Sequence, residues 1–148
     1  MREIIFRGKR TDSKGFVYGD YIHCGISGKD FIFPKDNEVN ESQLVGEEGC
    51  LKLFTFEVIP ETVGQYTGLT DKNGKKIFEG DIVKVKYDNT VGIVCFGRDG
   101  GGNLGFYIKW VGTHDYLRKD IAFWIDEREE IEVIGNIYDN PELLKESE

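Results

Sequence analysis

Apolar residues recur at every second position in short segments of this chain, a period that belongs to β-strands rather than to helices. In the segment 82–87, three apolar residues alternate with Lys84 and Lys86. The next apolar segment, 91–96, begins after the polar stretch 88–90, which is short enough to turn the chain back as a hairpin. Both segments are rich in β-branched residues, which pack well on a pleated surface. The pattern therefore predicts antiparallel β-structure.

Similar segments follow one another at intervals of roughly ten residues, as in small barrels and sandwiches. The strand candidates are 51–58, 82–87, 91–96, 106–110, 121–125 and 131–134. A short helix is predicted at 140–145, with Asn140 as its N-cap and Pro141 at its first position. The polar, acidic segment 35–50 is predicted to be a long loop. The sequence thus predicts a mainly β fold with a short C-terminal helix.

The length of 148 residues suits one domain or two small ones. We expect a β-rich N-terminal part at 1–60, which carries the polar loop, and a second β-rich part at 61–148. No apolar run approaches the ~20 residues that span a bilayer. The three cysteines form no C-x-x-C pair, and an odd number of separated cysteines fits a reducing compartment. We therefore expect a cytoplasmic protein that does not bind a membrane.

Acidic residues exceed basic ones, with 27 Asp plus Glu against 19 Lys plus Arg and a net charge of -8. This balance argues against a dedicated duplex-binding protein, because phosphate neutralisation supplies most non-specific affinity. Two stretches, 1–14 and 72–86, are nevertheless basic. The candidate nucleic-acid-binding residues are the lysines of the second stretch: Lys72, Lys75, Lys76, Lys84 and Lys86. The other interpretation is that these lysines occupy exposed turns and edge strands, where they discourage edge-to-edge pairing.

Residues able to catalyse a reaction or to ligate a metal do not cluster in the sequence. The dyads His23–Cys24 and His114–Asp115 are poor chelators, because adjacent residues of a strand point to opposite faces. Cys95 lies within an apolar strand candidate and is expected to pack in the core. The Gly-rich stretch 97–103 lacks the Lys-Ser/Thr ending of a P-loop and is expected to be a loop between two strands. We therefore expect no catalytic residue, no metal and no cofactor.

Two stretches of the chain share a turn pattern. Both stretches, Thr11–Gly15 and Thr70–Gly74, contain the pattern Asp-x-x-Gly. Each precedes a Gly-Asp pair. Asp opens a tight turn by accepting backbone N–H bonds, and Gly supplies the positive φ of the corner. The residues predicted to form structural turns are Asp12, Gly15, Gly19, Asp20, Asp71, Gly74, Gly80 and Asp81.

Aromatic residues make up 13% of the chain. They can fill the core, line a subunit interface, or stack single-stranded bases beside lysines on a barrel face. We favour the core first, an interface second and bases third. The residues concerned are Phe16, Tyr18, Tyr21, Phe106, Tyr107, Trp110, Phe123 and Trp124.

Four stretches of the chain resemble one known family. The stretch 62–84, with Asp71-Lys72-Asn73-Gly74-Lys75-Lys76-Ile77-Phe78-Glu79-Gly80-Asp81 at its centre, is similar to the signature of the YopX family of phage and prophage proteins. The opening stretches 2–10 and 17–20, and the closing stretch 131–144, also resemble that family. The likeness covers nearly the whole chain in the right order, and residues 27–51 match least.

The resemblance implies a phage- or prophage-encoded protein in the cytoplasm of a bacterial host. It implies that residues 61–148 form a small SH3-like β-barrel, and it brings no agreed activity and no catalytic residues. We therefore expect a non-catalytic accessory protein, either a protein-binding or a self-assembling β-module, with a protein partner or a homo-oligomer as its working form. The alternative is a nucleic-acid-binding module that uses the lysine-rich and aromatic face of the barrel.

Overall fold

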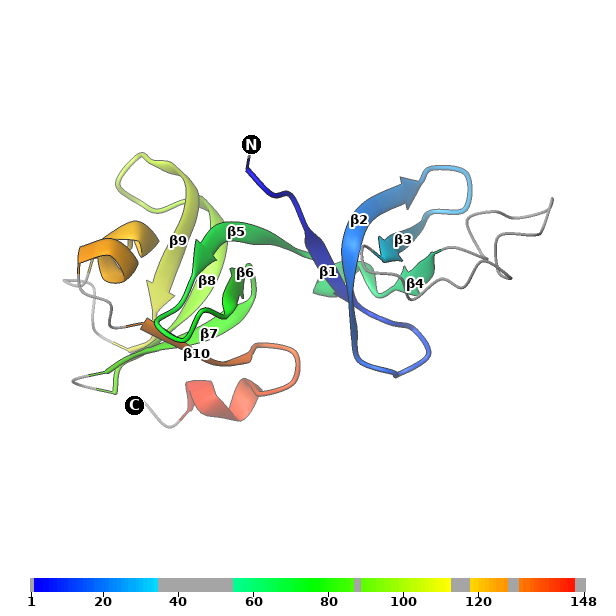
Figure 1. The fold of residues 1–148 in the computed structure, drawn as a ribbon. Helices are drawn as coiled ribbons and strands as arrows, with labels where there is room; N and C mark the ends of the chain where they lie inside the picture. Colours follow the sequence, from blue (N-terminus) through cyan, green and yellow to red (C-terminus); the bar gives the residue numbers. More distant parts are fainter. Residues whose placement is uncertain (1, 35–54, 87–88, 113–117, 128–130, 146–148) are drawn as a thin grey trace. The chain divides into compact units, whose positions relative to one another are not determined.

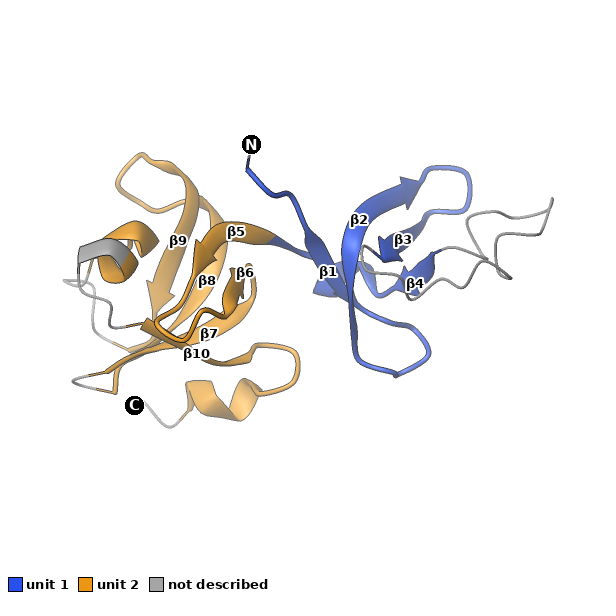
Figure 2. Cartoon of the chain, in the orientation of Figure 1, with its two compact units in different colours: residues 1–65 blue, residues 66–148 orange. Residues whose placement is uncertain are grey.

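The computed structural model describes residues 2–34, 55–86, 89–112, 118–127 and 131–145 (Figure 1). The predicted polar loop at 35–50 and the first part of the strand candidate 51–58 lie outside these residues. The chain divides into two compact units, residues 1–65 and residues 66–148 (Figure 2). The boundary falls inside strand β5 (Gly64–Thr70), a few residues after the predicted division at residue 60.

The fold is mainly β, as predicted, and its strands form two antiparallel sheets. One sheet has the order β4-β3-β2-β1-β5-β6 and the other the order β10-β7-β8-β9. The strands besides β5 are β1 (Phe6–Lys9), β2 (Phe16–Cys24), β3 (Lys29–Pro34), β4 (Phe56–Val58), β6 (Lys76–Phe78), β7 (Asp81–Val85), β8 (Val91–Arg98), β9 (Leu104–Trp110) and β10 (Ile131–Asn136). No closed barrel forms among the described residues.

In residues 1–65, strands β1 to β4 curl around a small apolar core. Val17, Ile32 and Val58 are buried there. The curl brings β4 back to the end of β1, where the Ile59 amide donates to the Lys9 carbonyl at 2.8 Å. Only an isolated bridge, rather than a continuous ladder, links these two strands. This part is therefore a rolled sheet.

In residues 66–148, the four-stranded sheet buries one face. Register places Val83 opposite Gly92 and Val94 opposite Ile108, so that alternate residues of neighbouring strands share the inner face. Trp110 from β9 meets Trp124 edge to face, with 5.5 Å between ring centroids. The core is completed by Ile77, Val85, Ile121, Ile131 and Val133. The expectation that aromatic residues fill the core holds for both tryptophans.

The segment 121–125 is helical, so its prediction as a strand is wrong. A short helical turn at 121–122 continues into a π-helical turn, η3 (Phe123–Glu127). Its apolar run has no alternation, and such a run cannot distinguish a strand from a buried helical turn. Ile121 and Trp124, three residues apart, are both buried in the core, and the Trp124 indole donates to the Arg118 carbonyl at 2.8 Å. Tertiary contacts therefore select the helical turn.

The C-terminal segment forms a single 3-10 turn, η4 (Pro141–Leu144). Asn140 holds the N-cap position and Pro141 opens the turn, as predicted, but the Asn140 side chain makes no capping hydrogen bond. The Asn140 side-chain oxygen instead accepts the Asn136 amide at 3.3 Å. Asn140 therefore serves the turn that follows β10.

A buried carboxylate fixes the β5–β6 hairpin to β10. Asp71 is 6% exposed. Its Oδ1 accepts the backbone amides of Asn73 and Lys75, both at 2.9 Å. Its Oδ2 accepts the Val133 amide of β10, also at 2.9 Å. Beside it the Lys72 amide donates to the Ile131 carbonyl at 3.2 Å. The hairpin turn thereby covers the free edge of β10.

The other predicted turn residues fall into two groups. Gly15, Gly74 and Gly80 have φ values of 89°, 79° and 91°, which favour glycine. Asp12 accepts the Lys14 amide at 3.1 Å. Asp81 is buried and accepts the Phe78 amide at 2.7 Å. These residues form the turns that the pattern describes.

Gly19 and Asp20 are not turn residues, because both lie inside β2. Glycine is required at position 19 for a different reason. A Cβ there would lie 1.9 Å from the Phe33 carbonyl oxygen of β3. Close approach of two backbones, rather than a bend, therefore explains this Gly-Asp pair, and Asp20 is exposed.

Replacing Asp71 with Ala should lower the free energy of unfolding of residues 66–148 by about 2–4 kcal/mol, because three backbone amides lose their acceptor. Both tryptophans lie in this unit, so chemical denaturation followed by tryptophan fluorescence measures its stability. Glu142→Ala, at an exposed carboxylate of the same unit, is the control and should change stability by less than about 0.5 kcal/mol. Equal stability of the two variants would contradict the role of Asp71.

Replacing Gly80 with Val should lower the thermal midpoint by several degrees, since a β-branched residue at φ 91° is strained by at least about 1–2 kcal/mol. Gly25→Val is the control, because a Cβ at Gly25 has nothing within 4 Å and its φ is not positive. Far-ultraviolet circular dichroism during heating measures both. An unchanged midpoint for Gly80→Val would show that the turn tolerates a side chain.

Candidate functional site at the β8–β9 hairpin

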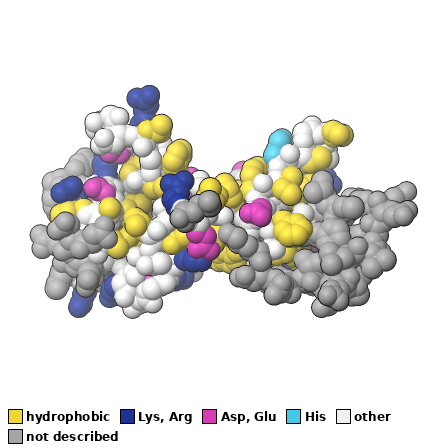
Figure 3. All heavy atoms as spheres, turned by 45° about the horizontal axis from the view of Figure 1, so that its top comes forward, with side chains coloured by type: hydrophobic (Ala, Val, Ile, Leu, Met, Phe, Trp, Pro, Cys, Tyr) yellow, Lys and Arg dark blue, Asp and Glu magenta, His cyan; other side chains and the backbone are white. Residues whose placement is uncertain are grey.

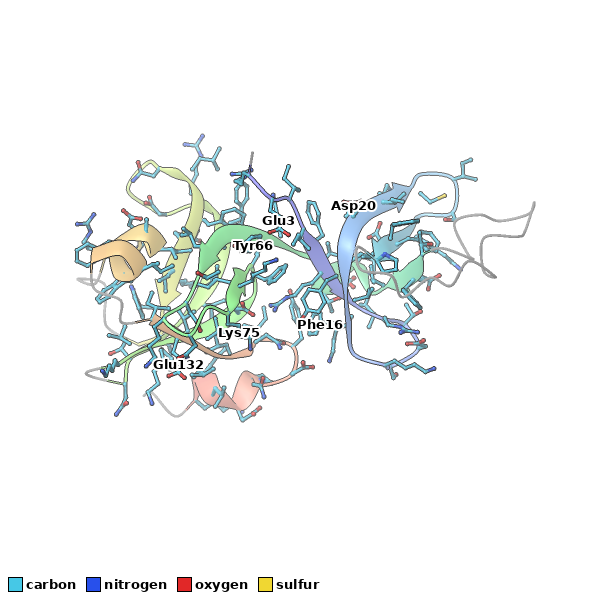
Figure 4. All side chains as sticks on the ribbon, viewed as in Figure 1. Glu3, Phe16, Asp20, Tyr66, Lys75 and Glu132 are labelled. Carbon is cyan, nitrogen blue, oxygen red and sulfur yellow. The ribbon has the colours of Figure 1, made fainter. Side chains whose placement is uncertain are left out.

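The lysines predicted to bind nucleic acid do not gather around an open aromatic face. Lys72 lies 3.5 Å from the Glu132 carboxylate of β10, and Lys84 stands opposite Glu132 in register. Figure 4 shows Lys75 on the β5–β6 hairpin and Glu132 on β10. Lys75 and Lys86 are exposed, and Glu132 lowers the net positive charge around this group.

Lys76 lies over the Tyr66 ring, with 5.4 Å from its Nζ to the ring centroid. That ring is buried and packs against Phe78, so it offers no free face on which a base could stack. The other basic stretch, residues 1–14, belongs to the other unit, residues 1–65. Nucleic-acid binding by this group therefore stays a prediction.

His23 forms a cross-strand pair that the sequence pattern did not reveal. Its Nδ1 lies 2.5 Å from the Asp30 carboxylate, which is buried, whereas the His23 side chain is 57% exposed. The β2–β3 register places Asp30 opposite His23, seven positions away along the chain. Burial, and then the hydrogen bond to Asp30, raise the pKa of Tyr21.

This group resembles the base and orienting acid of a hydrolase but carries no nucleophile on the same face. Cys24 follows His23 in β2 and therefore points to the opposite face. A hydrogen bond from Ser27 lowers the pKa of Cys24, whereas burial raises the pKa of Cys95. No three His, Cys, Asp or Glu side chains in the described segments converge as metal ligands, and His114, Asp115 and Cys50 lie outside those segments.

The Gly-rich loop between β8 and β9 is organised by Asp99. The carboxylate accepts the Gly101 amide at 2.7 Å, and the backbone and side-chain amides of Asn103 at 3.3 and 3.1 Å. Lys119 Nζ donates to the Asp99 carbonyl at 3.1 Å. The amides that a phosphate cradle would need thus point at the chain's own carboxylate. The loop is a turn closed around the Asp99 carboxylate.

The Asn103 side chain, followed by the Gly101 amide, lowers the pKa of Asp99 below its ordinary value. A lowered pKa stabilises the loop above the unfolded-state pKa, and this stabilisation disappears as pH falls through the folded-state pKa. Asn103→Ala should therefore raise the midpoint of the acid titration seen at the Gly101 amide by nuclear magnetic resonance. The control is Asn73→Ala, in the turn organised by Asp71, which should leave the midpoint of the Gly101 titration unchanged. Equal midpoints in all three proteins would contradict this assignment.

Beside this loop the hairpin exposes an apolar cluster. Phe96 of β8 is 55% exposed and Leu104 of β9 is 70% exposed. Phe106, which stands opposite Phe96, contacts it edge to face with 5.0 Å between ring centroids. We call these three residues, with Arg98 opposite Leu104, the hairpin end. Figure 3 shows apolar side chains that reach the surface among charged ones, and Figure 1 shows the hairpin projecting from its sheet.

The hairpin end includes an unpaired stretch of strand edge. The Ile108 amide donates to the Lys119 carbonyl at 2.8 Å, away from β8. In an antiparallel ladder the backbone direction alternates, so the amides and carbonyls of Leu104 and Phe106 also point away from β8. Neither residue has a backbone partner on that side among the described residues. Among the described residues, the edge of β9 is thus covered at Ile108 and open at 104–106.

A hollow of about 260 Å³ lies along this open edge. It is lined by Gly97, Asp99, Asn103, Leu104, Gly105, Phe106, Tyr107, Lys119 and Asp120. Sequence patterns predicted the strand and the loop but could not show which strand ends a sheet. The one available signal was the pair of large apolar residues beside a Gly-rich loop.

These features define a small, mainly β protein in which exposed apolar side chains and unpaired strand backbone meet at one hairpin. The chain belongs to the YopX family: the model of that family, described as YopX protein, matches residues 5–145. A solved structure, the crystal structure of protein EF1440 from Enterococcus faecalis, is 22% identical with a TM-score of 0.53, over 97% of this chain and 99% of that chain. That likeness shows a shared fold. No curated protein matches the chain.

Helices in the described part are all too short and too polar to cross a membrane.

Proposed function

We propose that this YopX protein is a non-catalytic binding module that holds a protein partner at the hairpin end. The observation that carries the proposal is the exposure of Phe96 and Leu104 beside an open strand edge. Exposed apolar residues next to unpaired backbone groups invite association with another chain, and proteins usually cover or charge such edges. Here the opposite edge of the same sheet is covered by the Asp71 turn.

We further infer that residues 66–148 are an open variant of the SH3-like barrel. Three strands, β7 to β9, form a meander, a helical turn follows, and β10 returns to pair with β7. That order of elements is the order of SH3-like barrels, which are a common scaffold for binding sites on loops and edges. A phage or prophage accessory role fits such a module.

Protein is favoured over nucleic acid as the partner. Of the predicted lysines, Lys72 lies beside the Glu132 carboxylate and Lys84 stands opposite Glu132 in register, and the aromatic ring next to Lys76 is buried. At the hairpin end, by contrast, large apolar side chains are exposed. Apolar and backbone groups recognise polypeptides, whereas phosphate recognition needs many free cations.

We propose no catalytic role for this protein. The most enzyme-like pair, His23 and Asp30, is an exposed imidazole with a buried carboxylate, and its sequence neighbour Cys24 is directed to the other face of β2.

A photo-crosslinking amino acid at position 96 tests the proposal in the cells that encode the protein. We expect discrete covalent adducts from position 96, and their loss when Leu104→Ser is added, because the apolar surface is then broken. The control is the same group at position 26, where Ile is fully exposed in the β2–β3 turn of the other unit.

An adduct of twice the chain mass identifies self-association, and any other discrete mass identifies a different protein. Both support the binding role. Identical adduct patterns at positions 96 and 26, or no adduct at either, would overturn the proposal. Circular dichroism of the purified variants establishes that they fold.

A further inference from the structure

We propose that the occupant of the hairpin end is an extended polypeptide segment with alternating apolar and acidic residues, added as a strand to the open edge of β9. This inference rests on the proposed function and specifies its partner. Strand addition obtains affinity from main-chain hydrogen bonds and specificity from alternate side chains.

The backbone of β9 supplies the main-chain part. Leu104 and Phe106 each present one amide and one carbonyl away from β8, two residues apart, which is the spacing of rungs on one edge of a strand. The Lys119 carbonyl already occupies the next rung, at Ile108. An added strand therefore lies in line with the segment 118–120 along the edge of β9 and ends where the two meet. The hollow beside 104–107 provides its space.

Side chains on the hairpin define the apolar half of the pattern. Phe96, Leu104 and Phe106 stand on paired positions of β8 and β9 and form one continuous apolar surface. Successive side chains of an added strand point to opposite faces, so every second residue of the guest contacts this surface. Those residues should be apolar.

Charge defines the other half. Residues 96–109 and 118–120 contain four bases, Arg98, Lys109, Arg118 and Lys119, against two acids, Asp99 and Asp120, an excess of two positive charges. On the whole chain the net charge is -8. These two stretches, 96–109 and 118–120, thus form a basic island on an acidic protein.

The two acids are already engaged. Asp99 accepts the loop amides, and Asp120 lies 3.5 Å from Arg118. Arg98 and Lys109 are exposed, and neither makes an ion pair within the described part of the chain. Arg98 stands on β8 opposite Leu104, on the apolar face, and Lys109 lies on β9 three residues beyond Phe106, on the other face. Acidic residues on the second face of a guest strand share the face of Lys109, and the excess of positive charge attracts them over a Debye length of about 8 Å.

A second copy of the chain fits this edge less well than an acidic segment. Pairing of β9 with β9 of another copy would bring two basic islands together, and like charges across an interface cost affinity. The outward amides and carbonyls also require a partner with a polypeptide backbone, which a nucleic acid lacks.

The test uses the full chain and fluorescent peptides of about eight residues, followed by fluorescence anisotropy. One peptide alternates valine and glutamate, and its matched control alternates valine and lysine. We expect the glutamate peptide to bind at least about tenfold more tightly, and to weaken as salt rises from about 50 to about 500 mM. Arg98→Glu with Lys109→Glu should reverse the preference.

Strand addition is tested separately through the backbone. Leu104→Pro removes an outward amide and should weaken binding of the glutamate peptide about tenfold or more, whereas Leu104→Ala should weaken its binding less. Methylation of alternate backbone nitrogens of the peptide leaves the protein unchanged and should abolish binding when it blocks the edge that faces β9.

Several results would overturn the inference. One is equal binding of the two peptides; another is unchanged binding of both N-methylated forms. Competition by a single-stranded oligonucleotide at equal concentration would mean that the site selects negative charge rather than a strand. Absence of peptide binding together with crosslinks at position 96 would remove this inference and leave the proposed function. Absence of both would remove both.

Discussion

Three backbone amides converge on the buried Asp71 carboxylate, and much of the second unit depends on that convergence. Two of the amides belong to the turn of Asp71 itself, and the third belongs to Val133 in β10. The same carboxylate thus closes the β5–β6 hairpin and attaches it to a strand 62 residues away. A buried carboxylate is costly unless its oxygens are satisfied, so the turn and β10 stabilise each other. The attachment also covers one edge of the four-stranded sheet and leaves the far edge, β9, as the exposed one.

Acidic residues serve the backbone repeatedly in this protein. Asp12, Asp81 and Asp99 accept amides of their own turns, as Asp71 does. Part of the acid excess therefore has a structural origin, because each carboxylate organises a corner that the chain needs between short strands. Where Asp99 organises the β8–β9 loop, its carboxylate accepts the Gly101 and Asn103 amides, and Arg98 is left as an exposed charge opposite Leu104. The loop chemistry and the surface chemistry of the hairpin are linked in this way.

Period-two alternation predicted β7 to β10, because buried residues alternate with less buried ones along part of each strand. It singled out neither β1 to β3 nor β5 and β6, and it misassigned 121–125, where an unbroken apolar run packs as a helical turn. The pattern Asp-x-x-Gly located the turn at 71–74, because its geometry is local. Gly19 was predicted as a turn residue from its Gly-Asp pair, yet its need for glycine comes from the backbone of β3, which no local pattern contains. The pairing of His23 with Asp30 was missed for the same reason.

By itself the amino-acid sequence determined the period of the strands, the positions of the local turns and the resemblance to the YopX family, since each depends on residues close together along the chain. Tertiary structure decided which strand ends a sheet, which edge is covered, and which charges find partners. Those properties depend on residues far apart in sequence, such as Asp71 with Val133 and Ile108 with Lys119, and on the fact that burial of one edge exposes another. The candidate binding site belongs to this second group.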